Sequence, residues 1–96
     1  MDYLRLCGWF VCETSQRWAA DPRMSGLPDV FAFREGVTLL LEIKTKTGKL
    51  RPSQVEFAEQ VKPHLFETLI YAVIRDVDEL IALERGAGRC RYEVTS

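Results

Sequence analysis

The sequence predicts one α/β domain in which helices flank a mixed β-sheet. Three features indicate this class: two apolar strands around a tight turn, a third apolar run after a helical segment, and a globular composition of 47% hydrophobic and 28% charged residues. A domain of 96 residues buries only a modest share of its surface. Association with a partner is therefore expected.

The N-terminal part predicts a helix end, a strand and a loop. Tyr3–Cys7 has the character of a helix that Gly8 stops, because glycine tolerates the left-handed conformation after a helix. Trp9–Thr14 is rich in aromatic and β-branched residues and predicts a strand. Ser15–Pro28 holds two prolines, one glycine and no apolar period, which indicates a loop.

Two strands, Asp29–Arg34 and Val37–Lys44, are predicted to form a hairpin around the turn Glu35-Gly36. The hairpin is followed by a basic loop over Thr45–Arg51, which contains a glycine. This order places the charged end of the second strand directly before a flexible, cationic segment.

A helix is expected from about Ser53, because Pro52 suits a first helical turn and Ser53 with Glu56 forms a capping-box pattern. Pro63 should bend or end this helix. The apolar run Thr68–Ile74 then predicts a strand buried on both faces. The link is long enough for a right-handed crossover, so this strand is expected to run parallel to its neighbour.

The C-terminal part predicts a short helix and an uncertain tail. Asp76 with Glu79 gives a second capping pattern, and the apolar residues after it supply one side of a helix that Gly86 should close. Beyond it, Cys90–Val94 is a candidate edge strand.

The predicted hairpin brings two acidic residues face to face. A turn centred between Glu35 and Gly36 places Asp29 directly opposite Glu42, with Cβ atoms about 4.5–5.5 Å apart. Because side chains alternate along a strand, Lys44 shares the face of Glu42. The residues expected to point the other way, into a core, are Leu39, Leu41 and Ile43.

Two opposed carboxylates repel, and burial raises the pKa of one of them unless a cation lies between them. Mg²⁺ prefers oxygen ligands and commonly takes one or two carboxylates. Asp29, Glu42 and the Ile43 carbonyl oxygen are therefore candidate Mg²⁺ ligands. Lys44 is placed to orient a water or to stabilise charge on a phosphate. The alternative is that Asp29 is a turn residue and that Glu42 and Lys44 form a solvated strand face.

Gln54 lies on the apolar stripe of the predicted helix, which continues through Ala58, Val61 and Leu65. It should therefore face the sheet near the end of the preceding strand, where a buried amide needs hydrogen-bond partners. We interpret Gln54 as a ligand of water, metal or phosphate in the site. The alternative is a structural glutamine that binds backbone groups.

The loop after the hairpin is a candidate phosphate-binding segment. Residues 44–51 carry four positive charges and no acid, in a chain whose 13 Lys and Arg and 14 Asp and Glu nearly cancel. Lys46, Lys49 and Arg51 are therefore the predicted DNA contacts. A merely solvated loop is the alternative.

Other chemistries have little support in the sequence. His64 is the only histidine, which disfavours a histidine-dependent phosphodiesterase, and Tyr71 lies in an apolar strand and is interpreted as core. Cys7, Cys12 and Cys90 lack metal-ligand spacing and indicate reduced thiols in a cytoplasm. No apolar run approaches the ~20 residues of a membrane span, so no membrane association is expected.

The pair Pro28-Asp29 followed by Glu42-Ile43-Lys44 resembles the PD-(D/E)xK nuclease motif. The wider context, with Met24–Asp29 ahead of the hairpin and Gln54 at the start of a helix, is similar to the VRR-nuclease branch. Leu4–Gln16 resembles that family's late first helix and first strand, so the resemblance spans residues 4 to 84. It implies a single VRR-nuclease-like domain over residues 1–96 with a restriction-endonuclease-like core.

For the matching positions, the resemblance implies metal ligation by Asp29, Glu42 and the Ile43 carbonyl, catalysis by Lys44 and an active-site role for Gln54. It implies hydrolysis of DNA phosphodiester bonds with Mg²⁺ or Mn²⁺. Small stand-alone members come from phages and bacteria, resemble enzymes of DNA repair that resolve Holliday junctions, and act as homodimers. Branched DNA, a second copy of the chain, and the cytoplasm of a bacterium or phage-infected host are the corresponding expectations.

One departure from the family concerns the first helix, which usually carries an acidic residue that supports the metal site. Met1 stands where that helix should be half finished, and Asp2 substitutes poorly on position alone. The first helix is therefore expected to be truncated, or the true start to lie upstream. A short helix would leave a group of apolar side chains for a partner to cover, namely Leu4, Leu6, Trp9 and Phe10.

Three functions follow from these patterns. The first is a metal-dependent endonuclease, the second a DNA-binding module of the same fold that does not cut, and the third a structural subunit with neither property.

Overall fold

The computed structural model describes residues 2–14 and 26–95, with side chains up to Gly86. Its elements are α1 (Asp2–Leu6), β1 (Phe10–Glu13), β2 (Val30–Arg34), β3 (Val37–Ile43), α3 (Pro52–Val61), the 3₁₀ turn η2 (Lys62–His64), β4 (Leu69–Ile74) and α4 (Val77–Thr95). The strands form one mixed sheet in the order β1-β2-β3-β4, antiparallel except for the parallel pair β3 and β4. The predicted mixed α/β fold and the parallel crossover are confirmed.

The hairpin of β2 and β3 has the predicted register. Val30 pairs with Leu41, and Arg34 pairs with Val37 next to the turn. Glu35 and Gly36 both have positive φ, at 50° and 89°, as a type I′ turn requires. A two-residue turn of this type fixes which residues face each other along the whole hairpin.

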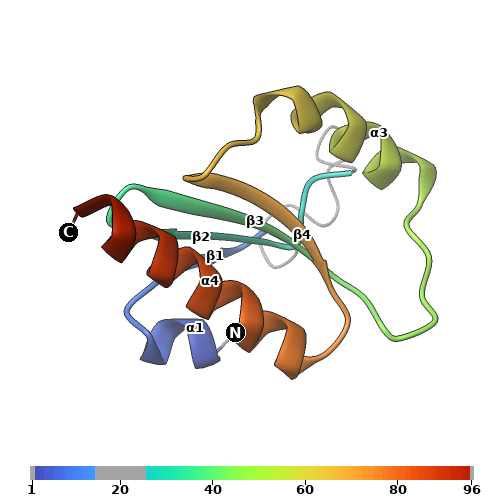
Figure 1. Ribbon diagram of the computed structural model, residues 1–96. Coiled ribbons are helices and arrows are strands. Elements are labelled where there is room, and N and C mark those ends of the chain that lie inside the picture. Colours follow the sequence, from blue (N-terminus) through green and yellow to red (C-terminus); the bar gives the residue numbers. More distant parts are fainter. Residues whose placement is uncertain (1, 15–25, 96) are drawn as a thin grey trace.

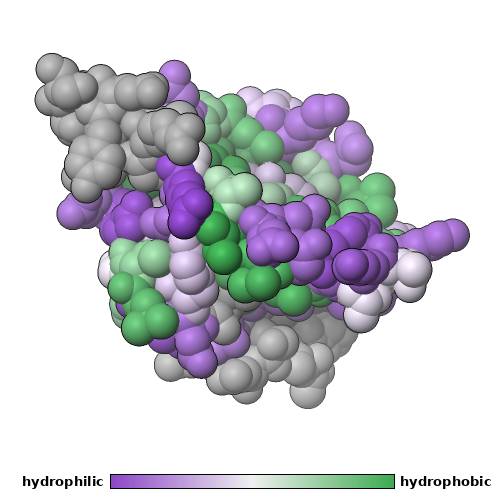
Figure 2. All heavy atoms as spheres, turned by 60° about the horizontal axis from the view of Figure 1, so that its bottom comes forward, coloured by the Kyte–Doolittle hydropathy of each residue, from purple (hydrophilic) through white to green (hydrophobic). Residues whose placement is uncertain are grey.

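Figure 1 shows α1 and α4 on one face of the sheet and α3 over the other. The core lies under α1 and α4, and its buried members are Leu4, Trp9, Val30, Ala32, Val37, Leu39, Leu41, Ile74 and Leu80. Seen from the side of α1 and α4, the surface is mostly hydrophilic with separate hydrophobic areas (Figure 2). No helix in the described part of the chain is long and apolar enough to cross a membrane.

Several expectations about this core need correction. The prediction that Ile43 lies in the core is wrong: it is 37% exposed, because it is the last residue of β3 and borders an open hollow beside α1 and α4. Leu4 and Trp9 were expected to need a partner, yet both are buried within the chain. Only Leu6 and Phe10 of that group stay exposed, at 86% and 67%.

A cation also ties the N-terminal segment to α4. The Arg34 guanidinium lies 4.6 Å from the centre of the Trp9 ring and donates to the Cys7 carbonyl at 2.8 Å and to Glu84 Oε1 at 3.0 Å. Glu84 is buried and would be costly there without this partner. Helix α1 ends before Gly8, as predicted, and Gly8 adopts a φ of 90°.

Helix α3 begins at Pro52, one residue before the expected Ser53, and its N-cap is Arg51 and not Ser53. Gln54 at the third helical position accepts the Arg51 backbone N–H, which is the role the capping pattern assigned to Glu56. The helix ends at Val61, where Pro63 forces the change to η2.

The C-terminal half differs most from expectation. β4 is a half-buried edge strand and not a strand buried on both faces, because within the described residues only β3 pairs with it along its length. α4 continues through Gly86 to Thr95, so the expected stop at Gly86 and the edge strand at Cys90–Val94 are wrong. A glycine inside a helix costs only about 1 kcal/mol relative to alanine, which the rest of a long helix offsets.

Gly26 provides a test of how the loop before the hairpin packs on α3. Its φ is 91°, and a Cβ atom there would overlap the backbone carbonyl of Ser53. Gly36 has nearly the same φ, 89°, but open space around it. We expect Gly36→Ala to lower the free energy of unfolding by about 1–2 kcal/mol through strain alone. Gly26→Ala should lower it by a further 1–3 kcal/mol or so, because the overlap adds to the strain.

Urea unfolding of the two variants and the unmodified protein measures this difference. Equal losses in the two variants would mean that the backbone at Gly26 does not pack against α3.

Candidate active site

Asp29 lies directly before β2, at the open end of the hairpin. Its carbonyl oxygen accepts the Thr14 N–H at 2.9 Å, which extends the β1–β2 pairing by one residue. Its carboxylate oxygen Oδ2 accepts the Ile43 backbone N–H at 2.9 Å. The Asp29 carboxylate is therefore held against the end of β3, as the hairpin register predicts.

Glu42 is the acidic partner on β3, and its side chain is completely buried. Its Oε1 atom accepts a hydrogen bond from Gln54 Nε2 at 2.8 Å. Its Oε2 atom is also buried but has no hydrogen-bond partner among the described residues. A buried carboxylate oxygen without a partner is unusual, and it calls for a proton, a water or a cation.

Gln54 joins α3 to this carboxylate. Its side chain is only 2% exposed, its Oε1 atom accepts the Arg51 N–H at 2.8 Å, and its Nε2 atom donates to Glu42. The backbone contact of the structural alternative is present at one end of the amide, and the other end faces the acidic pair. That Gln54 is a ligand of water, metal or phosphate stays a prediction. Because the backbone N–H needs the amide oxygen, Gln54 presents a donor to the site and orients Glu42.

The electrostatics match the conflict that the sequence predicts. Burial and, after it, the neighbouring Asp29 carboxyl raise the pKa of Glu42 from 4.5 to about 7. The positive charges of Lys44 and Arg51 act in the opposite direction. Near neutral pH the acidic pair therefore retains a proton part of the time, and a cation would have to displace it.

Tyr71 is the residue of this region that the sequence did not reveal. It pairs with Leu40 across β3 and β4, which puts it on the face of Glu42. Its ring lies 6.3 Å from the Phe57 ring of α3, and its hydroxyl is buried without a partner in the described structure. Burial and the negative charges of Glu42 and Asp29 raise its pKa, so the phenol stays a neutral donor. The only signal in the sequence was a polar tip within an apolar strand.

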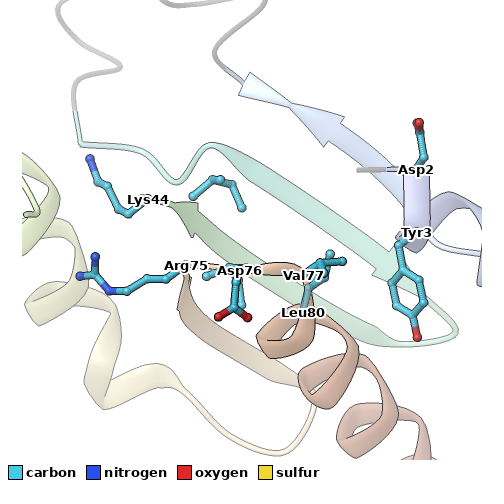
Figure 3. Close-up of a pocket in the computed structure, with 9 residues that line it drawn as sticks. Asp2, Tyr3, Lys44, Arg75, Asp76, Val77 and Leu80 are labelled. Carbon is cyan, nitrogen blue, oxygen red and sulfur yellow. The ribbon is translucent and has the colours of Figure 1, made fainter. Parts of the chain in front are cut away.

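Lys44 follows β3 and borders a hollow of about 320 Å³ at the ends of β3 and β4. Figure 3 shows Lys44 and Arg75 extending from one end of this hollow, with Asp2 and Tyr3 at the other. The charge of Lys44 lowers the pKa of Glu42, so the ammonium and the carboxylate lie within electrostatic reach. Lys46, Lys49 and Arg51 follow on the loop, all exposed.

The donors present fit a hard cation in part. Asp29 and Glu42 supply carboxylate oxygens, and the unpartnered Oε2 of Glu42 is free to act as a ligand. The Ile43 N–H faces Asp29, and the N–H and carbonyl of one strand residue face the same neighbour, so the Ile43 carbonyl lies on the Asp29 side. The residues that the structure describes contain no group of three or more acidic, histidine or cysteine ligands.

The fold and the site are thus an α/β domain with an acidic pair, of which Glu42 is buried, a glutamine donor and an adjacent lysine. No family model matches the chain, and neither the curated proteins nor the solved structures give a match.

The raised pKa of Glu42 predicts how stability depends on pH without metal. Well below pH 4.5 the group is protonated in both states. Between pH 4.5 and about 7 the unfolded chain releases this proton while the folded protein retains it, so the free energy of unfolding falls as pH rises. Glu42→Gln has the same shape but does not titrate, so its stability should fall less across this interval.

The measurement is urea unfolding of both proteins at several pH values between 4 and 8.5 in a chelator. Parallel pH dependences in the two proteins would contradict the assignment of a raised pKa to Glu42.

Proposed function

We propose that this protein is a metal-dependent DNA endonuclease with a restriction-endonuclease-like core of the VRR-nuclease type. The observation that supports it most is the acidic pair, in which the buried Glu42 has one carboxylate oxygen without a partner beside Asp29. A pair of this kind is costly unless a cation or a proton compensates it. If the protein uses a divalent cation, the presence of this costly acidic pair is explained.

In this proposal Asp29, Glu42 and the Ile43 carbonyl hold Mg²⁺ or Mn²⁺. A divalent ion held by these groups would supply Lewis-acid chemistry for phosphodiester hydrolysis. Gln54 keeps the Glu42 carboxylate in one orientation through its Nε2–H bond. Lys44, beside the pair, stabilises the negative charge that develops on the phosphate or orients the attacking water.

The proposed substrate is branched DNA such as a Holliday junction. The exposed cations Lys46, Lys49 and Arg51 follow the site directly and suit contacts with the DNA backbone. Two copies related by a two-fold axis would present two sites to two strands, and C₂ dimers are the commonest oligomers. The exposed Leu6 and Phe10 are side chains that a second copy could cover. The proposed setting is DNA repair in the cytoplasm of a bacterium or phage-infected cell.

One observation favours a second candidate, a DNA-binding module of the same fold that does not cut. The described residues offer two carboxylates at the site and no third acidic ligand. If two carboxylates and a carbonyl bind the ion too weakly, the basic loop would still hold DNA. Salt-sensitive binding without cleavage in Mg²⁺ or Mn²⁺ would identify this function.

Cleavage assays decide between the two candidates. We expect the protein to nick a four-way junction in Mg²⁺ or Mn²⁺ faster than a flap, a single strand or a duplex. Asp29→Ala, Glu42→Ala and Lys44→Ala should each lower the rate by about 100-fold or more, because each removes a group that contacts the ion or the phosphate. Lys62→Ala, which removes an exposed lysine from η2, is the matched control and should retain the activity. Cleavage that all three site variants share with the unmodified protein would come from a contaminant.

Metal binding can be measured without DNA. Titration calorimetry with Mn²⁺ should show one site per chain, and its affinity should rise as pH increases through about 7, because the ion competes with the proton on Glu42. Asp29→Asn and Glu42→Gln should each abolish the binding. If these variants bind Mn²⁺ like the unmodified protein, the ion is held elsewhere.

A further inference from the structure

Arg75 binds the basic loop through two hydrogen bonds from its side chain. It follows the last residue of β4, and its Nη1 atom donates to the carbonyl oxygen of Thr45 at 2.7 Å and to that of Gly48 at 2.6 Å. The Gly48 N–H donates to the same Thr45 carbonyl at 3.2 Å. One guanidinium nitrogen therefore binds both ends of the turn Thr45–Gly48.

The turn is also compact. A Cβ atom on Gly48 would lie 2.9 Å from Thr45 Oγ1, so the glycine packs closely against the Thr45 side chain. Hydrogen bonds from a charged donor are stronger than those between neutral groups, so two of them to backbone carbonyls restrain such a short segment effectively. The exposed cations Lys46 and Lys49 lie within and next to the restrained turn.

Arg75 is itself fixed from two sides. The parallel ladder of β3 and β4 continues past the strands, with the Lys44 N–H donating to the Ile74 carbonyl at 3.0 Å. The Arg75 N–H donates to Glu79 Oε1 at 2.6 Å, and the Glu79 N–H donates to Asp76 Oδ1 at 2.9 Å in the first turn of α4. The sheet and the helix cap thus orient the arginine that orients the loop.

We propose that Arg75 is a positioning residue for DNA binding, which holds the turn Thr45–Gly48 so that Lys46 and Lys49 meet phosphates in a fixed arrangement. The inference rests on the proposed function, because it needs the loop to bind DNA. Its physical basis is that an ordered loop loses less conformational entropy on binding than a free one. Arg75 acts through the loop and not through its own charge.

Salt dependence separates these two roles. Each phosphate contact adds about 0.9 to the slope of log affinity against log salt concentration for B-form DNA. If Arg75 contributed only its own charge, Arg75→Gln would lower the slope by one contact, as Lys49→Gln should. If Arg75 positions the loop, Arg75→Gln disturbs several cations and should lower the slope by about two contacts.

The experiment measures the affinity of the unmodified protein, Arg75→Gln, Arg75→Lys and Lys49→Gln for a four-way junction at several salt concentrations, in EDTA so that no cleavage occurs. We expect Arg75→Gln to weaken binding by about 10-fold or more and Lys49→Gln to weaken it less. Arg75→Lys keeps the charge and one donor nitrogen on a different stem, so its affinity should fall between those of Arg75→Gln and the unmodified protein.

Amide hydrogen exchange at Gly48 gives a second readout that needs no DNA. It should be faster in Arg75→Gln than in the unmodified protein and unchanged in Lys49→Gln. The positioning role would be overturned if exchange at Gly48 were unchanged in Arg75→Gln. It would also be overturned if Arg75→Lys kept full affinity while Arg75→Gln lowered the salt slope by only one contact. If Lys46→Gln and Lys49→Gln both bind DNA like the unmodified protein, the proposed DNA-binding loop itself is wrong, which is a different failure.

Discussion

Two carboxyl groups held close together at the open end of a β-hairpin, one of them buried, are the constraint around which the rest of this structure is arranged. The hairpin register brings Asp29 to the end of β3, where its carboxylate accepts the Ile43 N–H, and alternation along β3 turns Glu42 toward the same face. Burial makes the charged pair expensive, which is why the pKa of Glu42 moves to about 7. The surrounding groups compensate only partly, with one donor from Gln54 and nearby positive charge from Lys44.

The packing of helix α3 on the sheet involves the same carboxyl group, Glu42. Gln54 is its only fully buried residue, and the Gln54–Glu42 hydrogen bond and the ring contact between Phe57 and Tyr71 join the helix to the sheet. The opposite face of the sheet is covered differently, by apolar side chains under α1 and α4. The main hydrophobic core therefore covers one face, and the candidate site lies on the other, which α3 covers. Changes at Glu42 affect the docking of α3 as well as the chemistry.

The sequence was sufficient for those parts of the site that local rules determine. Glu35-Gly36 specifies a turn with two positive φ angles, and that turn alone fixes the register that brings Asp29 to Glu42. Helical periodicity placed Gln54 on the inward face of α3, which its burial confirms. The division of its amide between Arg51 and Glu42 was not predictable, because it depends on how far the helix lies from β3.

Contacts between β3 and β4, which the crossover through α3 connects, could not be predicted from the sequence. The pairing of β4 with β3 sets which residues meet, and no local pattern encodes that register, so the sequence does not predict the positions of Tyr71 and Arg75 near the site. The length of α4 was missed for a related reason. Gly86 can end a helix or be tolerated inside one, and the difference is about 1 kcal/mol, which a longer helix readily offsets.

In the proposed function, the acidic pair and the basic loop make metal binding and DNA binding interdependent. The chain is nearly neutral overall, yet Glu42 is buried near the end of β3 while the cations that follow stay exposed. A phosphate drawn to Lys46 and Lys49 would bring more negative charge toward Asp29 and Glu42 and be repelled by them. A divalent cation between the carboxylates reverses the sign of that interaction, so each ligand must raise the affinity for the other by the same factor. The arrangement that makes the acidic pair costly in the free protein is thus the one that ties cleavage to the simultaneous presence of ion and substrate.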